Sequence, residues 1–258
     1  MTGNPDGPAM MLAHGFGCDQ NMWRLVVPAL AEHFRVILFD HVGAGRSDRS
    51  AWRPERHARL DGYAEDVLEI CRELGLRELT LVGHSVSAMI GVLAAVREPE
   101  RFARLVLLTP SPRYVDDVGY RGGFSRADID ELLESLDANY LGWSAALAPV
   151  IMGTPERPEL GEELANSFCR TDPTIAKAFA RTTFLSDNRE DLAEVTVPTL
   201  VVECAADAIA PRGIGAFVAD RVPGSTLVTL DATGHCPQLS APEATAAAIL
   251  DFALAGAR

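Results

Sequence analysis

A serine, an aspartate and a histidine each follow a short apolar run in this sequence, and together they are residue types used in nucleophilic catalysis. Ser85 stands in LVGHSVSAMIG, between an apolar run and a helical pattern. Asp207 follows TLVVECAA, and His235 follows TLVTLDATG. A serine hydroxyl is a weak nucleophile that needs a base, and the base needs an acid to orient it. We therefore expect Ser85 as the nucleophile, His235 as the general base and Asp207 as the residue that orients the base.

The residues around Ser85 favour a strained strand-to-helix turn that exposes the serine oxygen. Such a turn requires very small neighbours two positions before and after the serine, where this chain has Gly83 and Ser87. The usual pattern G-x-S-x-G is thus met as G-x-S-x-S. Taken alone, the motif also fits a serine that caps a core helix.

Each partner of Ser85 has an alternative interpretation as well. Asp207 could be a solvated loop carboxylate, with Asp231 at the end of the last apolar run as a competitor. His235 could be a capping or core histidine. His84, the variable position of the turn, is not expected to take part in catalysis.

The first apolar run leads into LAHGFGCDQ, a His-Gly loop that could supply oxyanion donors. We expect the backbone N–H groups of Phe16 and Val86 to face the developing negative charge, at about 3 kcal/mol per donor. His14 is expected to shape this loop rather than to transfer protons, and a plain glycine turn is the alternative. DHVGAGRSD (residues 40–48) lacks the spacing of a dinucleotide fingerprint, so we interpret it as structural support beneath the site.

Strand and helix patterns alternate along most of the chain, which predicts a doubly wound α/β fold with a mostly parallel sheet. Because the carboxyl ends of parallel strands meet at one edge, Ser85, Asp207 and His235 can converge there. The predicted strands are residues 9–13, 34–40, 79–83, 105–109, 199–204 and 226–231. The predicted helices are residues 19–33, 60–74, 87–96, 212–221 and 242–255.

The alternation stops between about residues 113 and 194, where four helical patterns follow one another without a convincing strand. The first begins at Ser125, with Asp128 three residues further on as its capping partner. The others cover residues 143–150, 159–170 and 173–184. We therefore predict a core of residues 1–112 and 195–258, and a helical lid of residues 113–194.

Composition excludes several function classes. The chain has 258 residues, 48% of them hydrophobic, and a formal net charge of −13, so nucleic acid and anionic membranes are poor partners. No apolar run approaches the roughly 20 residues that a membrane span needs, and no signal peptide is visible, so we predict a cytoplasmic protein. Five cysteines without a CxxC pair predict neither disulfides nor metal, and we expect no cofactor.

Several motifs together resemble the RsbQ group of α/β hydrolases, which includes the plant karrikin and strigolactone receptors. They are HGFGCDQNMW, DHVGAGRSD, GHSVSAMIG, SPRYVDD with GGFS, and GHCPQLS. The resemblance implies a V-shaped lid of four helices, a triad of Ser85, His235 and Asp207, and a deep apolar pocket beneath the lid. It also implies pocket residues, each of which could instead be lid core: Phe16, Phe124, Leu147, Phe168 and Phe184.

Two features depart from this family pattern. Only residues 1–8 precede the first predicted strand, where the family usually has a β-hairpin. We therefore expect about six strands with residues 34–40 as an exposed apolar edge, unless the true start lies upstream. The other departure is Cys236, directly after the expected catalytic histidine, which is either a reactive thiol or a packed, inert one.

These observations predict a carboxylesterase-like serine hydrolase of small apolar esters or lactones, acting through an acyl-serine intermediate. The resemblance implies slow turnover and a role in stress signalling. One alternative is a ligand sensor with little catalysis whose lid binds a PAS-domain phosphatase. A lesser alternative is a perhydrolase or lyase, because fold does not fix the reaction. We expect a small apolar ligand and a monomer or weak dimer.

Overall fold

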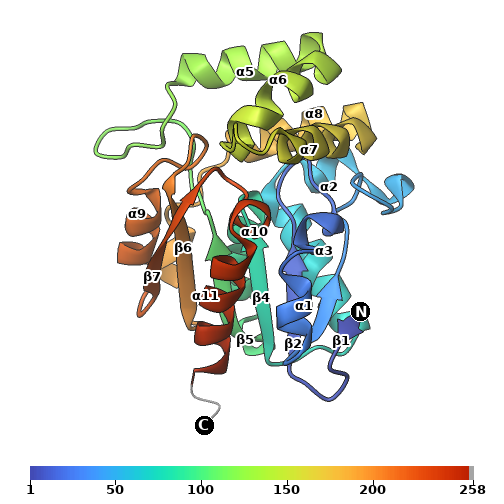
Figure 1. Cartoon of the computed structure of the whole chain (residues 1–258), viewed down its shortest axis with the longest axis vertical. Coiled ribbons are helices and arrows are strands. Elements are labelled where there is room, and N and C mark those ends of the chain that lie inside the picture. The colour runs from blue at the N-terminus through green and yellow to red at the C-terminus, as the bar shows by residue number, and fades with distance from the viewer. Residues whose placement is uncertain (256–258) are drawn as a thin grey trace.

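A seven-stranded sheet runs through the centre of the molecule in the computed structural model, which describes residues 1–255 (Figure 1). The strand order is β1-β3-β2-β4-β5-β6-β7, and every neighbouring pair is parallel except β1 with β3. The strands are β1 Thr2–Gly3, β2 Ala9–Ala13, β3 Arg35–Leu38, β4 Leu79–His84, β5 Phe102–Leu108, β6 Thr199–Ala206 and β7 Thr226–Thr233. The predicted α/β-hydrolase fold is confirmed, and each predicted strand has a counterpart in the sheet.

The N-terminal edge of the sheet differs from the prediction of six strands. Residues Thr2–Gly3 form a short β1 that pairs antiparallel with β3, with Thr2 opposite Val36. The chain then turns back, and the Asn4 N–H donates to the Ala31 carbonyl at 3.0 Å. The edge predicted at residues 34–40 is thus covered in part, and Val36 is fully buried. A two-residue strand held by contacts some thirty residues away leaves no periodic pattern in the sequence, and the prediction missed it for this reason.

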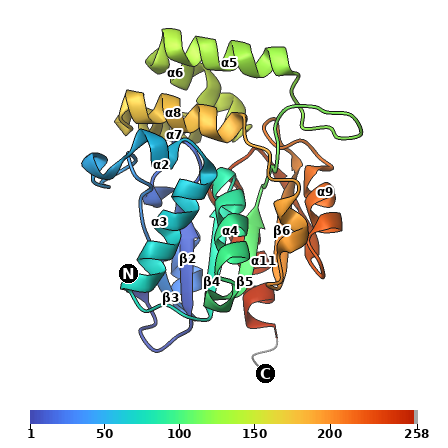
Figure 2. The same ribbon diagram turned by 180° about the vertical axis from the view of Figure 1, so that it is seen from behind.

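Helices cover both faces of the sheet. The apolar core therefore consists of two clusters, one on each face. Helices α1 and α11 lie on the face seen in Figure 1, and α3, α4 and α9 lie on the opposite face, seen in Figure 2. Their bounds are α1 Val27–Ala31, α3 Leu60–Glu73, α4 Val86–Arg97, α9 Ile214–Arg221 and α11 Pro242–Leu254. Short elements complete the core: α2 Pro54–His57, α10 Pro237–Ser240, η1 Gln20–Trp23, η2 Arg49–Ala51, η3 Pro99–Arg101 and η4 Asp191–Glu194.

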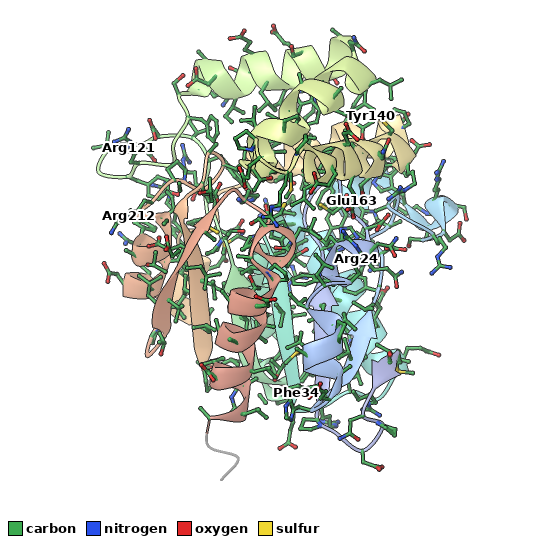
Figure 3. The ribbon with its side chains drawn as sticks, in the orientation of Figure 1. Arg24, Phe34, Arg121, Tyr140, Glu163 and Arg212 are labelled. Atoms are coloured by element: carbon green, nitrogen blue, oxygen red, sulfur yellow. The ribbon has the colours of Figure 1, made fainter. Side chains whose placement is uncertain are left out.

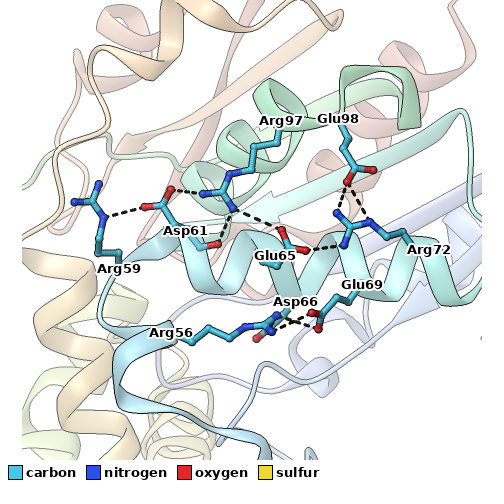
Figure 4. A network of polar contacts seen from close by, with 9 residues as sticks. All are labelled: Arg56, Arg59, Asp61, Glu65, Asp66, Glu69, Arg72, Arg97 and Glu98. Atoms are coloured by element: carbon cyan, nitrogen blue, oxygen red, sulfur yellow. Dashed lines mark hydrogen bonds and ion pairs between the residues drawn. The ribbon is translucent and has the colours of Figure 1, made fainter.

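Ion pairs tie α3 to α4 and to the residues that flank these helices (Figure 4). Arg72 pairs with Glu65 at 2.6 Å and also contacts Glu98, which follows α4. Arg97 of α4 reaches back to Asp61 of α3. These side chains are about one third exposed, so we assign the network a modest role in holding α3 and α4 together.

Four helices stand as a separate layer above the carboxyl ends of the strands (Figures 1 and 2). We call this layer the helical cap; it comprises α5 Arg126–Ala138, α6 Tyr140–Met152, α7 Pro158–Arg170 and α8 Pro173–Phe184. Ser125 and Asp128 form the predicted capping box at the start of α5. Helices α7 and α8 face the core and α5 lies farther out, whereas the end of α6 reaches the core, where the Ile151 carbonyl accepts from the His235 N–H at 2.8 Å. Within residues 1–255, no helix has both the length and the apolar character required to cross a membrane.

Candidate active site

Ser85 occupies a strained turn between β4 and α4, as the motif predicts. Its backbone has φ 57° and ψ −122°, a conformation that non-glycine residues rarely adopt. The turn brings strand and helix so close that a Cβ atom at Gly83 would lie 2.2 Å from the carbonyl oxygen of Ser87. Glycine is therefore required before the serine, whereas the fully buried Ser87 is accommodated after it.

The structure brings Ser85, His235 and Asp207 together in one hydrogen-bonded chain. His235 Nε2 lies 2.7 Å from Ser85 Oγ, and His235 Nδ1 lies 2.7 Å from Asp207 Oδ2. Because a carboxylate can only accept, Nδ1 carries the proton and Nε2 is free to accept from the serine hydroxyl. We call these three residues the Ser–His–Asp chain.

Asp207 is held by its surroundings in the ionised form. Its Oδ1 accepts hydrogen bonds from the backbone N–H groups of Ile209 at 2.8 Å and Ala210 at 3.1 Å. Burial alone would raise the pKa of the Asp207 carboxyl, but His235 and these backbone donors lower it below its usual value. Its competitor Asp231 is exposed to solvent on β7, so the structure favours Asp207 as the partner of His235.

His84, which was not expected to take part in catalysis, and Thr109, which was not predicted to have a role, anchor the backbone of His235. His84 Nε2 lies 2.8 Å from the His235 carbonyl oxygen, and the Thr109 hydroxyl lies 3.1 Å from the same atom. Burial, followed by the nearby His235, lowers the pKa of His84 to about 3, so His84 is neutral at ordinary pH. His84 thus positions the histidine loop from the strand-to-helix turn itself, without contacting the Ser85 oxygen.

The His-Gly loop after β2 lies against this turn, as predicted. A Cβ atom at Gly15 would lie 3.2 Å from Ser85 Cβ and closer still to the His84 ring. Within residues 1–255, neither the Phe16 N–H nor the Val86 N–H donates a hydrogen bond to another residue. Both groups are therefore free to serve a ligand, as the oxyanion role predicted for them requires.

Ser87 links the helix after Ser85 to the His-Gly loop through a directed series of hydrogen bonds. Its hydroxyl donates to the His14 carbonyl at 2.5 Å, so His41 Nε2, 2.7 Å away, must be the donor to Ser87 Oγ. The His41 backbone N–H in turn donates to His14 Nε2 at 3.0 Å. His14 therefore shapes the loop, as predicted, and Ser87 connects the two backbone segments that carry Phe16 and Val86.

The DHVGAGRSD segment supports this arrangement, in agreement with its predicted structural role. Asp40 accepts from the Gln20 backbone N–H at 2.8 Å and from the Arg46 backbone N–H at 2.9 Å. It thereby joins the end of the His-Gly loop to its own glycine-rich loop.

Ser85 faces a small, mostly apolar cavity between the core and the helical cap. Its volume is about 30 Å³, room for only one or two water molecules, so it is far smaller than the deep pocket that the resemblance implies. Aromatic rings fill the space: Phe16 lies 5.5 Å from Phe168 and 6.0 Å from Phe184, ring centre to ring centre. A larger groove of about 600 Å³ opens elsewhere, beside Trp52 and α8, and the Ser–His–Asp chain does not line it.

Four of the five residues predicted for the pocket line this cavity, namely Phe16, Leu147, Phe168 and Phe184. Phe124 does not, and its prediction is wrong. Its backbone N–H donates to the Tyr114 carbonyl at 3.2 Å, and the ring of Tyr114 takes the place at the cavity. The motif SPRY contained Tyr114 but was used only as a family marker, so this residue was missed.

Other cavity residues were also missed, because spacing alone does not show which helix faces point inward. They are Cys18, Ile151, Leu164, Thr183 and Ile209. Cys236 also lines the cavity, where burial raises the pKa of its thiol well above the usual value. A buried thiol with a raised pKa fits the packed, unreactive interpretation of Cys236.

The fold and the Ser–His–Asp chain define a class of protein that comparison with known families confirms. The chain belongs to the α/β hydrolase family, because the family model described as "alpha/beta hydrolase fold" matches residues 8–242.

Within this family, the chain is similar to plant karrikin and strigolactone receptors, as its motifs predicted. It is 39% identical over 234 residues to "Strigolactone esterase D14" of Arabidopsis thaliana, covering 90% of this chain and 87% of that protein. It is 38% identical over 242 residues to "Karrikin insensitive 2 receptor IA" of Petunia hybrida, covering 93% and 88%. A solved hydrolase from Oleispira antarctica, olei00960, is 42% identical, with a TM-score of 0.90 over 92% of this chain and 87% of that chain.

Proposed function

We propose that this chain is a serine hydrolase that cleaves small apolar esters or lactones through an acyl-Ser85 intermediate. The observation that carries the proposal is the Ser–His–Asp chain, with both hydrogen bonds at 2.7 Å, opening onto an apolar cavity. The N–H groups of Phe16 and Val86, which donate to none of the described residues, support it, since acyl transfer needs donors for an oxyanion. Hydrolase and esterase names among the relatives agree with this class.

In the acylation step, Ser85 Oγ forms a bond to the ester carbonyl carbon while its proton passes to His235 Nε2. The negative charge that develops on the carbonyl oxygen is stabilised by the N–H groups of Phe16 and Val86. The bond to the alkoxy oxygen then breaks, and His235 returns the proton to this leaving group. Asp207 keeps the other proton of the imidazole on Nδ1 throughout.

Deacylation uses the same residues with water as the nucleophile. His235 Nε2 takes a proton from the water as its oxygen bonds to the acyl carbon, and it returns that proton to Ser85 Oγ when the acyl–serine bond breaks. The products are a carboxylic acid and free enzyme. No cofactor is needed in either step.

The size of the cavity makes movement of the helical cap part of this proposal. A volume of about 30 Å³ is smaller than an ester with its leaving group, so the side chains of α6, α7 and α8 that line the cavity must shift before substrate reaches Ser85. We propose that this opening makes turnover slow.

The proposal is tested with a phenylmethylsulfonyl fluoride adduct and a nucleophile variant. We expect intact mass to show one sulfonyl group on the protein, located at Ser85 by peptide mapping, and Ser85→Ala to abolish p-nitrophenyl acetate hydrolysis. Ser240→Ala is the matched control, since Ser240 is a serine outside the cavity. Absence of the adduct, or hydrolysis that persists unchanged in Ser85→Ala, would refute the proposal.

A second candidate function is ligand sensing, in which capture of a ligand changes the position of the helical cap and a protein partner detects that change. The nearly filled cavity favours it, because any ligand must displace aromatic rings from the cap. Relatives named as receptors support it. The resemblance to RsbQ points to a PAS-domain phosphatase as the partner. Ligand-dependent binding of such a phosphatase in a pull-down would support this function, and equal binding with and without ligand would count against it.

A further inference from the structure

Two buried hydroxyl groups stand among the apolar residues of the cavity, outside the Ser–His–Asp chain. They belong to Tyr114, on the segment after β5, and Thr183, in the last turn of α8. We propose that Tyr114 and Thr183 form a polar subsite, so that this protein selects esters or lactones carrying a second oxygen atom beside the scissile carbonyl. This inference rests on the proposed hydrolase function and adds to it the class of substrate.

Tyr114 is placed to donate a hydrogen bond next to Ser85. Its side chain is 1% exposed, and its ring packs against Phe184 at 5.1 Å between centres. Burial raises the pKa of its phenol well above the usual value. The phenol therefore stays protonated at ordinary pH. Tyr114 lines the same cavity as Ser85, so the phenol proton is available to an oxygen atom of a bound ligand.

Thr183 contributes a buried hydroxyl to the lining of the cavity. The residue is 1% exposed and its Oγ1 has no hydrogen-bond partner in the part of the chain that the structure describes. Thr183 immediately precedes Phe184, whose ring contacts both Tyr114 and Phe16. Helical threonines commonly bond to a carbonyl one turn earlier, but no such bond to Phe179 is formed. The hydroxyl thus remains available to a ligand in the cavity.

A purely apolar ligand would leave both hydroxyls without a partner and without water. Leaving one buried polar group unpaired reduces affinity roughly tenfold, whereas a ligand oxygen that accepts from it avoids this loss. Sites built to hydrogen-bond an oxygen discriminate strongly against the analogue that lacks it. The expected substrates are therefore small neutral esters or lactones with an ether, keto or hydroxyl oxygen close to the carbonyl group.

The test compares p-nitrophenyl methoxyacetate with p-nitrophenyl butyrate, which differ only by an oxygen in place of a methylene group. The measured quantity is the ratio of their kcat/KM values in each protein. The intrinsic reactivity of the two esters cancels when ratios are compared between variants. We expect Thr183→Val and Tyr114→Phe each to lower this ratio roughly tenfold relative to the unmodified protein. Thr183→Ser, which retains a hydroxyl, should restore most of the preference.

Thr154→Val is the matched control. Thr154 also has a buried hydroxyl without a partner among the described residues, but it does not line the cavity. Its replacement should leave the ratio unchanged. Ratios that stay within about twofold in both Thr183→Val and Tyr114→Phe would overturn the subsite, and a change in only one variant would overturn the pairing of the two hydroxyls.

A binding measurement separates this inference from the proposed function. Ser85→Ala is titrated with methoxyacetone and pentan-2-one, which show the same oxygen-for-methylene difference and are not hydrolysed. Binding is followed by NMR chemical shifts. A preference for methoxyacetone that falls when Thr183→Val is added supports the subsite, even if no ester proves to be a substrate. Ser85-dependent hydrolysis with an unaltered binding preference leaves the hydrolase function standing and overturns the subsite.

Discussion

The two sides of the site are held in different ways. On the core side, directed hydrogen bonds fix each group: His235 is bonded at both ring nitrogens and at its carbonyl, and Ser87 joins the turn to the His-Gly loop. All six histidines of the chain lie on this side, and none falls within residues 113–194. On the cap side, the residues that line the cavity are mostly aromatic and aliphatic and pack against one another, and the Thr183 hydroxyl has no partner among the described residues. One backbone hydrogen bond, from the His235 N–H to the Ile151 carbonyl at 2.8 Å, joins α6 to the core side.

The two sides therefore have different roles: the core side fixes the positions of the reacting groups, and the cap side controls access to them. Hydrogen bonds have narrow preferred distances and angles, so the core side suits chemistry that requires fixed positions. Apolar packing is not directional, so the cap side can rearrange around a ligand and close again. Ion pairs at the rim connect the two sides, and Figure 3 shows one of them, between Arg24 of the core and Glu163 of α7.

The largest effect is expected from Asp207→Asn, which changes the hydrogen bond between Asp207 and His235 Nδ1. An amide can donate to His235 Nδ1 and so favour the wrong tautomer, which should lower kcat on the order of 10⁴-fold. The value of kcat is measured from the rate of ester hydrolysis at saturating substrate concentration. Asp231→Asn makes the same chemical change at an exposed position and should leave kcat unchanged. A loss of less than about tenfold in Asp207→Asn would contradict the role assigned to Asp207.

Acidic pH should lower the free energy of unfolding, because of the buried histidines on the core side. Burial lowers the pKa values of His14, His41 and His84, the last to about 3, so the unfolded chain binds protons more readily than the folded one. Stability is then greatest above the unfolded pKa of about 6.5 and falls as the pH drops through that value. Between pH 7 and 5, His84 alone should reduce the free energy of unfolding by about 2 kcal/mol.

Urea unfolding at several pH values tests this dependence. His33, which is exposed on the core surface, provides a control, because His33→Gln should leave the pH dependence intact. A free energy of unfolding that stays flat or increases between about pH 7 and pH 5 would show that the buried histidines do not govern stability.

Ser87→Ala should have an intermediate effect, because it removes a connection within the core side but no reacting group. Loss of its hydroxyl leaves the His14 carbonyl unpaired and loosens the loop that carries Phe16. We expect kcat to fall roughly tenfold with little change in KM, since the donors act on the transition state. Ser87→Thr, which keeps the hydroxyl, should retain more activity if it is accommodated. A raised KM with an unchanged kcat would indicate lost substrate binding instead.

The smallest effect is expected from removal of the ion pair between Arg24 of the core and Glu163 of α7. Arg24 and Glu163 form two short hydrogen bonds of 2.6 and 2.7 Å, but their side chains are 40% and 37% exposed. Solvent screening limits such a pair to about 1 kcal/mol or less. Glu163→Gln should therefore shift the urea midpoint only slightly, as should the control Glu162→Gln. A loss well above this value would mean that ion pairs, rather than apolar packing, hold the cap.

The core side was predicted from the sequence better than the cap side. The physical reason is that the core side carries local sequence signals, whereas the packing of the cap depends on contacts between distant segments. Strand periodicity and the strained turn at Ser85 are local signals, and parallel topology then brings Asp207 and His235 to the same edge. The roles of His84, Thr109 and Ser87 as anchors depend on contacts between distant segments, so spacing did not show them. The two-residue β1 was missed for a similar reason.

For the cap, the pattern predicted that four helices exist but not how they pack. The amphipathic stripes identified inward faces in general, yet whether Phe124 or Tyr114 points at the cavity depends on the backbone pairing of residues 115 and 124. The size of the cavity depends on how the rings of Phe16, Phe168 and Phe184 interlock. Neither is encoded in a periodic pattern.

The most direct test of this account is to trap the acyl-enzyme. The protein is mixed with p-nitrophenyl acetate, quenched in acid within the first turnovers, and examined by intact mass and peptide mapping. The account predicts one added acetyl group, located on Ser85, that disappears as hydrolysis is completed and is absent in Ser85→Ala. Hydrolysis without any acetylated protein, or an acetyl group that persists at another residue, would contradict it.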